Sequence, residues 1–203
     1  MNLDRLLELA YRLARFGAWF GGGLIVAAAL LVGVEVVIRK AFNLTIGGAD
    51  ELSGFALAIA TTWGLAFTLL ERAHVRIDSL YIHLPVRVAA LLDLIGLALF
   101  IGFFGLVTWH GYGVFATSLR VGAHSLSPLG TPLVIPQALW VAGLVLFLAI
   151  ATLLLTRAAL AFVRGDLGTM RRLVGSRTLT EEMAAELDRP EDAASAAEVR
   201  ARR

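Results

Sequence analysis

The stretch "LVIPQALWVAGLVLFLAIATLLLT", residues 133–156, carries no charged side chain from end to end. A helix needs about 20 mainly apolar residues to cross a hydrocarbon core of roughly 30 Å, so this stretch is long enough to span a bilayer. Three more runs of similar length, residues 17–38, 52–70 and 88–109, hold at most one acidic residue each. With 58% hydrophobic residues among 203, the chain is too apolar for a soluble domain of this size. We therefore predict an all-α integral membrane protein with four transmembrane helices.

Basic residues near the ends of the four runs predict which way the chain crosses the membrane, because cytoplasmic loops are enriched in Lys and Arg. With both termini in the cytoplasm, ten of these residues lie inside and three outside, and the opposite orientation inverts the ratio. The inside set is Arg5, Arg12, Arg15, Arg72, Arg76, Arg87, Arg157, Arg164, Arg171 and Arg172, and the outside set is Arg39, Lys40 and Arg120. The sequence therefore favours both termini inside.

The segments that flank the spans differ in character. Residues 1–16 place leucines and alanines at helical spacing, with charged side chains mainly on the other side, which predicts an amphipathic helix on the membrane surface. Residues 17–163 form the predicted four-helix membrane domain. Residues 164–203 begin with arginines and then become acidic and alanine-rich, so we expect a cytoplasmic tail that is partly disordered.

Two acidic residues fall inside the predicted spans, where a charged group is costly and often functional. Glu35 precedes Arg39 by four residues, a spacing that permits an ion pair on one helix face, and a role in proton or ion transfer is the alternative. Asp93 lies near the inner end of its span, where water or a neighbouring arginine can reach it. Beyond Thr61 and Thr62, no polar group lies deep in spans two and four, so the sequence gives little support to a substrate pathway through this chain alone.

Histidines and acids cluster between spans two and three, but their number and depth argue against a bound metal or haem. His74 and Asp78 would share one helix face, whereas a metal site needs three or four ligands, and the chain has no cysteine. Haem needs two inward-facing histidines at matching depth, and all four histidines lie at or beyond the ends of spans. We expect no metal, no cofactor and no catalytic residue. The net charge is only +2 and no basic stripe for nucleic acid is present.

Small residues four positions apart occur in the first two spans, where they let helix backbones approach closely in lipid. The pairs are Gly17 with Gly21, Gly54 with Ala58, and Ala60 with Gly64. Such pairs either pack the four helices on one another or form contacts with another protein. Trp63 lies deeper in its span than the other tryptophans do and is a further candidate for such a contact.

Four motifs occur in an order and spacing that resemble one family of membrane proteins. "VIRKAFN" at residues 37–43 ends span one, and Glu51 opens span two with Gly64 thirteen residues later. "HVRIDSLYIHLP" at residues 74–85 follows, and "SPLGTP" at residues 127–132 precedes the last span. Across residues 34–160 the chain resembles the small, DctQ-type membrane subunit of tripartite ATP-independent periplasmic (TRAP) transporters. The tryptophan that this family usually carries shortly before the acid of span two is missing here.

This resemblance implies a non-enzymatic subunit of the bacterial inner membrane. Its partners would be a large, elevator-type membrane subunit and a periplasmic binding protein that delivers an organic acid for sodium-coupled uptake. The small subunit would brace the scaffold of the large one. Carried over by position, the signature residues that would hold helix ends and subunit contacts are Arg39, Glu51, Gly64, His74, Asp78 and Pro85.

Two other functions are compatible with four spans. The chain could be a self-sufficient, homo-oligomeric small transporter that uses Glu35 as its coupling acid. It could also be the membrane anchor of a redox enzyme, although the positions of the histidines disfavour bound haem.

Overall fold

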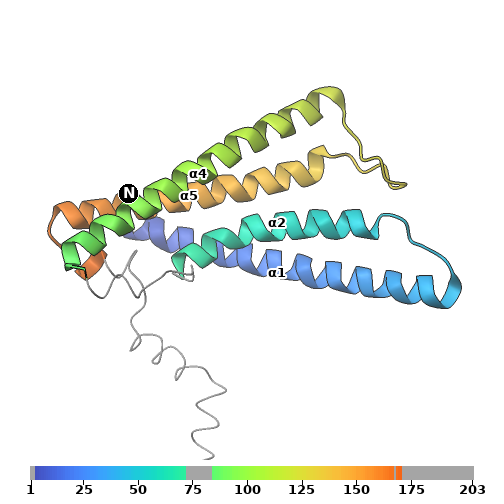
Figure 1. Ribbon diagram of the computed structural model, residues 1–203, viewed down its shortest axis with the longest axis horizontal. Helices are drawn as coiled ribbons and strands as arrows, with labels where there is room; N and C mark the ends of the chain where they lie inside the picture. The colour runs from blue at the N-terminus through green and yellow to red at the C-terminus, as the bar shows by residue number, and fades with distance from the viewer. Residues whose placement is uncertain (1–2, 72–83, 167, 171–203) are drawn as a thin grey trace, which may run out of the picture.

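Four long helices make up most of the computed structural model, which describes residues 3–71, 84–166 and 168–170 (Figure 1). They are α1 (Leu3–Phe42), α2 (Ala49–Leu70), α4 (Val86–Val121) and α5 (Val134–Val163). Each is long and apolar enough to cross a membrane. The described residues contain no strand, only an isolated bridge between His124 and Pro132. The predicted fold class, an all-α membrane protein with four spanning helices, is confirmed.

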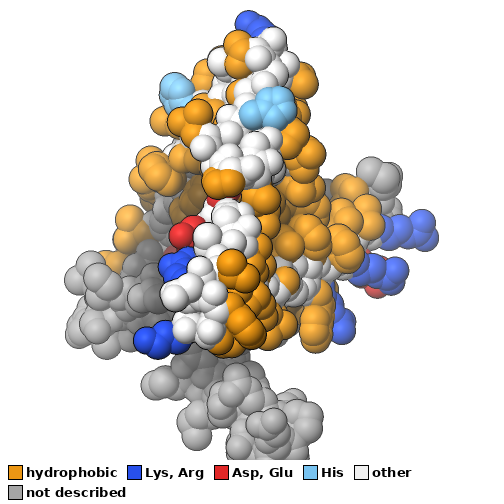
Figure 2. Space-filling view, turned by 90° about the vertical axis from the view of Figure 1, so that its right-hand side faces the viewer, with side chains coloured by type: hydrophobic (Ala, Val, Ile, Leu, Met, Phe, Trp, Pro, Cys, Tyr) orange, Lys and Arg blue, Asp and Glu red, His pale blue; other side chains and the backbone are white. Residues whose placement is uncertain are grey.

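The helices form two antiparallel hairpins, α1 with α2 and α4 with α5, which pack together through α2 and α5 (Figure 1). This arrangement places α1 and α4 on the outside. In the most apolar part of each helix, 39% of the residues of α5 are buried within the chain, against 11% for α1 and 17% for α4. The outer helices therefore present most of their apolar side chains to lipid or to other proteins, and hydrophobic side chains cover much of the face shown in Figure 2.

The core lies at the end of the bundle where α1 begins and α5 ends. Phe147 of α5 is fully buried there, and the rings of Phe100 and Phe104 from α4 meet it edge-on at 5.6 and 4.9 Å between centroids. Ala10 and Ala14 from α1 belong to the same cluster. Towards the opposite end the two hairpins diverge in Figure 1. There the loop between α1 and α2 contacts the loop between α4 and α5.

Two helices, α1 and α4, are much longer than the spans predicted for them. At 1.5 Å per residue α1 is about 60 Å long and α4 about 54 Å, against roughly 30 Å of hydrocarbon. Helix α1 runs without interruption from the segment predicted to be interfacial into the first span. Helix α4 continues to Val121, twelve residues beyond residue 109, where the third span was predicted to end. The tail beyond residue 170 and the turn at 72–83 lie outside the described residues.

Candidate functional site

A buried carboxylate near the C-terminal end of α1 ties this helix to the loop that follows it. Glu35 is only 2% exposed. Its Oε1 accepts hydrogen bonds from Arg39 Nη2 at 2.7 Å and from Thr45 Oγ1 at 2.7 Å. Its Oε2 accepts one from the backbone N–H of Ile46 at 2.8 Å. The structure thus brings Glu35 and Arg39 together, as their spacing suggested, and adds two donors from the loop.

The loop donors were not foreseen, because they depend on backbone conformations that the spacing of charges does not reveal. Asn43, Gly47 and Gly48 all have positive φ, at 53°, 64° and 98°, and they turn the chain back towards α1. Thr45 sits between these turns, and its hydroxyl oxygen also accepts the N–H of Gly47 at 3.3 Å. The adjacent glycines were the available signal, since a left-handed backbone favours glycine.

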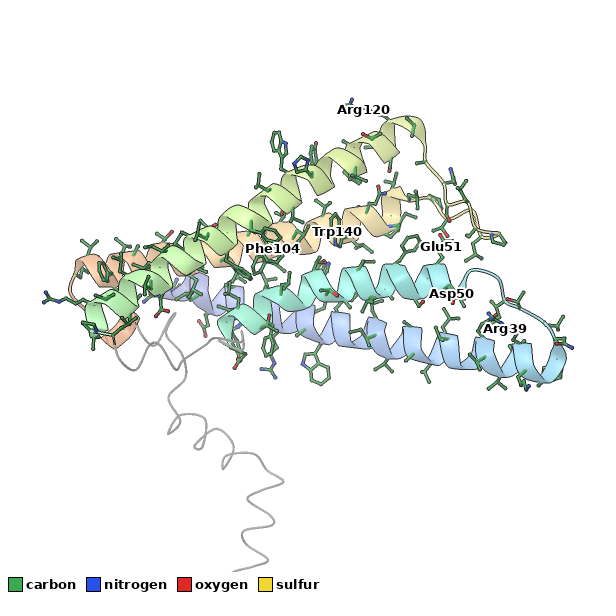
Figure 3. All side chains as sticks on the ribbon, in the orientation of Figure 1. Arg39, Asp50, Glu51, Phe104, Arg120 and Trp140 are labelled. Carbon is green, nitrogen blue, oxygen red and sulfur yellow. The ribbon has the colours of Figure 1, made fainter. Side chains whose placement is uncertain are left out.

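A second carboxylate faces the other connecting loop. Glu51 lies in the first turn of α2, and both of its carboxylate oxygens are buried. The hydroxyls of Ser125, Ser127 and Thr131, all from the α4–α5 loop, lie beside it, outside regular hydrogen-bond geometry. Figure 3 shows Glu51 and Asp50 at this end of α2, close to the two loops. Glu51 therefore contributes to contacts within this chain.

Close packing of the two loops accompanies the Glu51 contact. Gly48 lies directly against the side chain of Leu129, and any Cβ at this position would collide with it. The φ of 98° at Gly48 disfavours other residues as well. Gly47 meets the ring of Pro128 at ordinary contact distance, 3.8 Å from an ideal Cβ position. The two hairpins are thus joined at this end by their loops.

Trp63 is the central polar and aromatic contact between helices. Its indole N–H donates to the carbonyl of Leu139 on α5 at 2.9 Å. Its ring meets Phe20 of α1 at 5.2 Å and Phe16 at 6.4 Å, in both cases edge-on. An ideal Cβ at Gly143 would lie 2.7 Å from the Trp63 ring, so only glycine lets α5 approach this closely. The tryptophan that we considered for contact with a further partner therefore packs inside this chain.

The glycines of the small-residue pairs divide into an inner and an outer set. An ideal Cβ at Gly17 would lie 2.6 Å from the carbonyl oxygen of Trp63, and one at Gly21 would lie 2.9 Å from that of Ala60. These glycines pack α1 on α2. At Gly54 and Gly64 an added Cβ would meet nothing within 4 Å. The outer set leaves a face of α2 open.

Pro85 and Asp93 lie at the core end of the bundle. Pro85 precedes α4 and its carbonyl accepts the N–H groups of Val88 and Ala89, at 2.9 and 3.1 Å. Asp93 is 6% exposed on α4. His74 and Asp78 lie outside the described residues.

Hydroxyl groups inside the helices bond to their own backbone. Each of six threonines donates to a carbonyl three or four residues earlier, which satisfies the hydroxyl without a second helix. They are Thr61, Thr62, Thr68, Thr108, Thr117 and Thr156. Among the described residues no three of His, Asp and Glu gather as metal ligands would.

These features define a polytopic helical membrane protein in which the described polar side chains join helix ends, loops and neighbouring helices. A family model of the DctQ component of tripartite ATP-independent periplasmic transporters matches residues 28–161. The chain therefore belongs to this family, as its motifs suggested, and is the small permease subunit of a TRAP transporter. Comparisons with curated proteins and with solved structures find no match.

Proposed function

We propose that this chain is the scaffold that braces a large, elevator-type membrane subunit during sodium-coupled uptake of an organic acid. A periplasmic binding protein delivers the acid, and the large subunit carries the substrate and sodium sites. The chain itself is not an enzyme and sits in the bacterial inner membrane with both termini in the cytoplasm. Membership of the DctQ family and four apolar helices support this proposal.

The observation that supports the proposal most directly is the set of hydrogen bonds that the carboxylate of Glu35 accepts. If the chain worked alone with Glu35 as its coupling acid, this carboxylate would have to gain and lose a proton or cation in each cycle. The oxygens of Glu35 instead bind the guanidinium of Arg39, the hydroxyl of Thr45 and the N–H of Ile46. Releasing these donors would also release the loop. Glu35 is therefore better suited to anchoring a loop than to coupling transport.

We further propose which residues contact the large subunit. The side chain of Arg39 is 60% exposed in spite of its ion pair, so its outer edge remains accessible. Gly64 lies on the open face of α2, where a partner helix can approach the backbone closely. Pro85 is exposed at the start of α4. His74 and Asp78, from the turn before it, complete the proposed set.

Purification from native membranes tests the scaffold role. Tagged protein extracted in mild detergent should co-purify with a hydrophobic subunit of about twice its size or more, identified by mass spectrometry. The variant that combines His74→Ala with Asp78→Ala should retain less of that subunit and support less transport. If both stay unchanged, the turn is not a subunit contact. A chain that purifies alone, or only with itself, would count against the scaffold role.

Flux measurements in liposomes separate the scaffold from a self-sufficient transporter. The chain alone should give no uptake of organic acid, and uptake should appear when the large subunit and the binding protein are added. Glu35→Gln should lower this uptake only in part. Flux from the chain alone that Glu35→Gln abolishes would instead establish Glu35 as a coupling acid.

A further inference from the structure

A groove on the outward face of α1 has the shape and charge of a lipid site. It has a volume of about 760 Å³ and runs along one face of α1, with Phe67 of α2 as part of its wall. Tyr11, Arg15 and Trp19 lie towards one end, and the rest is lined by Ala18, Gly22, Gly23 and Val26. Arg15, Trp19, Gly22 and Val26 follow one another at intervals of three or four residues, so they share one face of α1.

The hollow exists because two neighbouring residues lack side chains. An ideal Cβ at Gly22 or at Gly23 would meet nothing within 4 Å, in contrast to Gly17 and Gly21, which pack against α2. The space beside Gly22 and Gly23 is therefore not needed for contact between the helices. Trp19 stands beside the hollow with 76% of its surface exposed.

The part of the groove between Arg15 and Val26 is about as long as one leaflet of a bilayer is thick. Eleven residues separate Arg15 from Val26, which at 1.5 Å per residue is about 17 Å along the helix. Half of a hydrocarbon core of roughly 30 Å is about 15 Å. A lipid whose headgroup lies at Arg15 would therefore place its acyl chain along Gly22, Gly23 and Val26.

Arg15 supplies a positive charge at the headgroup end of the groove, and two acids of this region, Glu8 and Glu71, bond to other residues. Glu8 pairs with Arg12 at 3.6 Å, and Glu71 accepts a hydrogen bond from Tyr11 Oη at 2.9 Å. Arg15 is exposed and makes no ion pair with the described residues. An arginine at the end of an apolar groove is suited to a phosphate group, which it binds with paired N–H donors.

We propose that this groove binds an anionic phospholipid, with the phosphate at Arg15 and one acyl chain beside Gly22 and Gly23. Trp19 flanks the chain near the headgroup, a depth that suits an indole. The lipid belongs to the leaflet at the N-terminal end of α1. It fills a hollow that would otherwise interrupt the apolar surface of an outer helix.

Quenching of tryptophan fluorescence by brominated lipid tests the site. Trp109 is equally exposed at 76%, so the full-length chain is prepared with Trp109→Phe, which leaves Trp19 as the indole most open to lipid. The protein is reconstituted in phosphatidylcholine bilayers with increasing fractions of dibrominated phosphatidylglycerol or dibrominated phosphatidylcholine. The anionic lipid should quench at about fivefold lower fraction, the factor that one basic residue contributes at an anionic surface.

Matched variants locate the effect. Arg15→Gln should abolish the preference for phosphatidylglycerol, and Arg120→Gln, at the other end of the bundle, should keep it. Gly22→Leu fills the hollow without a clash in the chain and should abolish the preference, whereas Gly33→Leu, equally unobstructed on α1, should keep it. A preference that is absent, or that survives Arg15→Gln, would overturn the proposal. So would a Gly22→Leu variant that loses the large subunit but keeps the lipid preference, because the groove would then hold a protein helix.

Discussion

Glu35 is an acidic side chain in an apolar helix, and its neighbours explain how it is accommodated. Burial of a carboxylate is costly unless hydrogen bonds replace the water that it loses. Thr45 and the N–H of Ile46 come from a loop that these bonds themselves help to order, whereas Arg39 has a mostly exposed side chain whose attraction water weakens. The loop donors should therefore matter more to stability than the arginine.

Single substitutions around Glu35 should follow that order. Thr45→Val removes one hydroxyl donor at similar volume and should cost about 1 kcal/mol, which corresponds to roughly 2–4 °C in Tm. Glu35→Gln should lower Tm further, since an amide cannot accept from all of the donors. Arg39→Gln should lower it least. Thermal unfolding in detergent measures the series, and a larger loss for Arg39→Gln than for Thr45→Val would contradict the ranking.

At the scale of elements, the helix ends show what hydropathy can and cannot predict. The apolar run of α4 ends at Trp109, but the residues that follow contain no proline and continue the helix to Val121. Its end is set by Gly122, whose left-handed backbone (φ 60°) stops the helix, and whose N–H bonds to the carbonyl of Ser118. Hydropathy marks where apolar side chains end, and capping marks where the helix ends. Hydropathy was enough to predict the four spans, whereas the length of α4 depends on where its C-terminal cap lies.

The glycines of α1 allow a matched test of helix packing. Gly17→Ala should force α1 away from the backbone of Trp63, which cannot move aside as a side chain can, and should cost about 1–3 kcal/mol. Gly33→Ala meets nothing, and it should be neutral or stabilise by roughly 0.5–1 kcal/mol through helix propensity. In thermal unfolding, only Gly17→Ala should lower Tm. Equal effects would show that the α1–α2 contact does not depend on Gly17.

At the scale of the whole molecule, the two hairpins are held by contacts of different kinds at their two ends. Aromatic and aliphatic side chains form the core at one end, and at the other Gly48 and Glu51 meet the α4–α5 loop. The ion pair of Glu35 followed from a spacing of four residues. The approach of Glu51 to the second loop joins segments more than seventy residues apart, and no local pattern encodes it. The sequence could thus predict spans and local pairs, but not the contacts between the loops.

The orientation that the distribution of charge predicts for the whole molecule is open to direct labelling. The chain contains no cysteine, so an introduced cysteine is the only thiol. Leu126, at 105% exposure, lies in the α4–α5 loop, and Thr169 is exposed beyond α5. Leu126→Cys and Thr169→Cys leave every charge unchanged, so the excess of arginine that should hold both termini inside is preserved. A membrane-impermeant maleimide added to intact spheroplasts should label Leu126→Cys alone, and lysis should expose both sites. Labelling of Thr169→Cys before lysis would show that the topology is the reverse of the predicted one. The Glu35 cluster would then lie on the cytoplasmic side, away from any periplasmic binding protein.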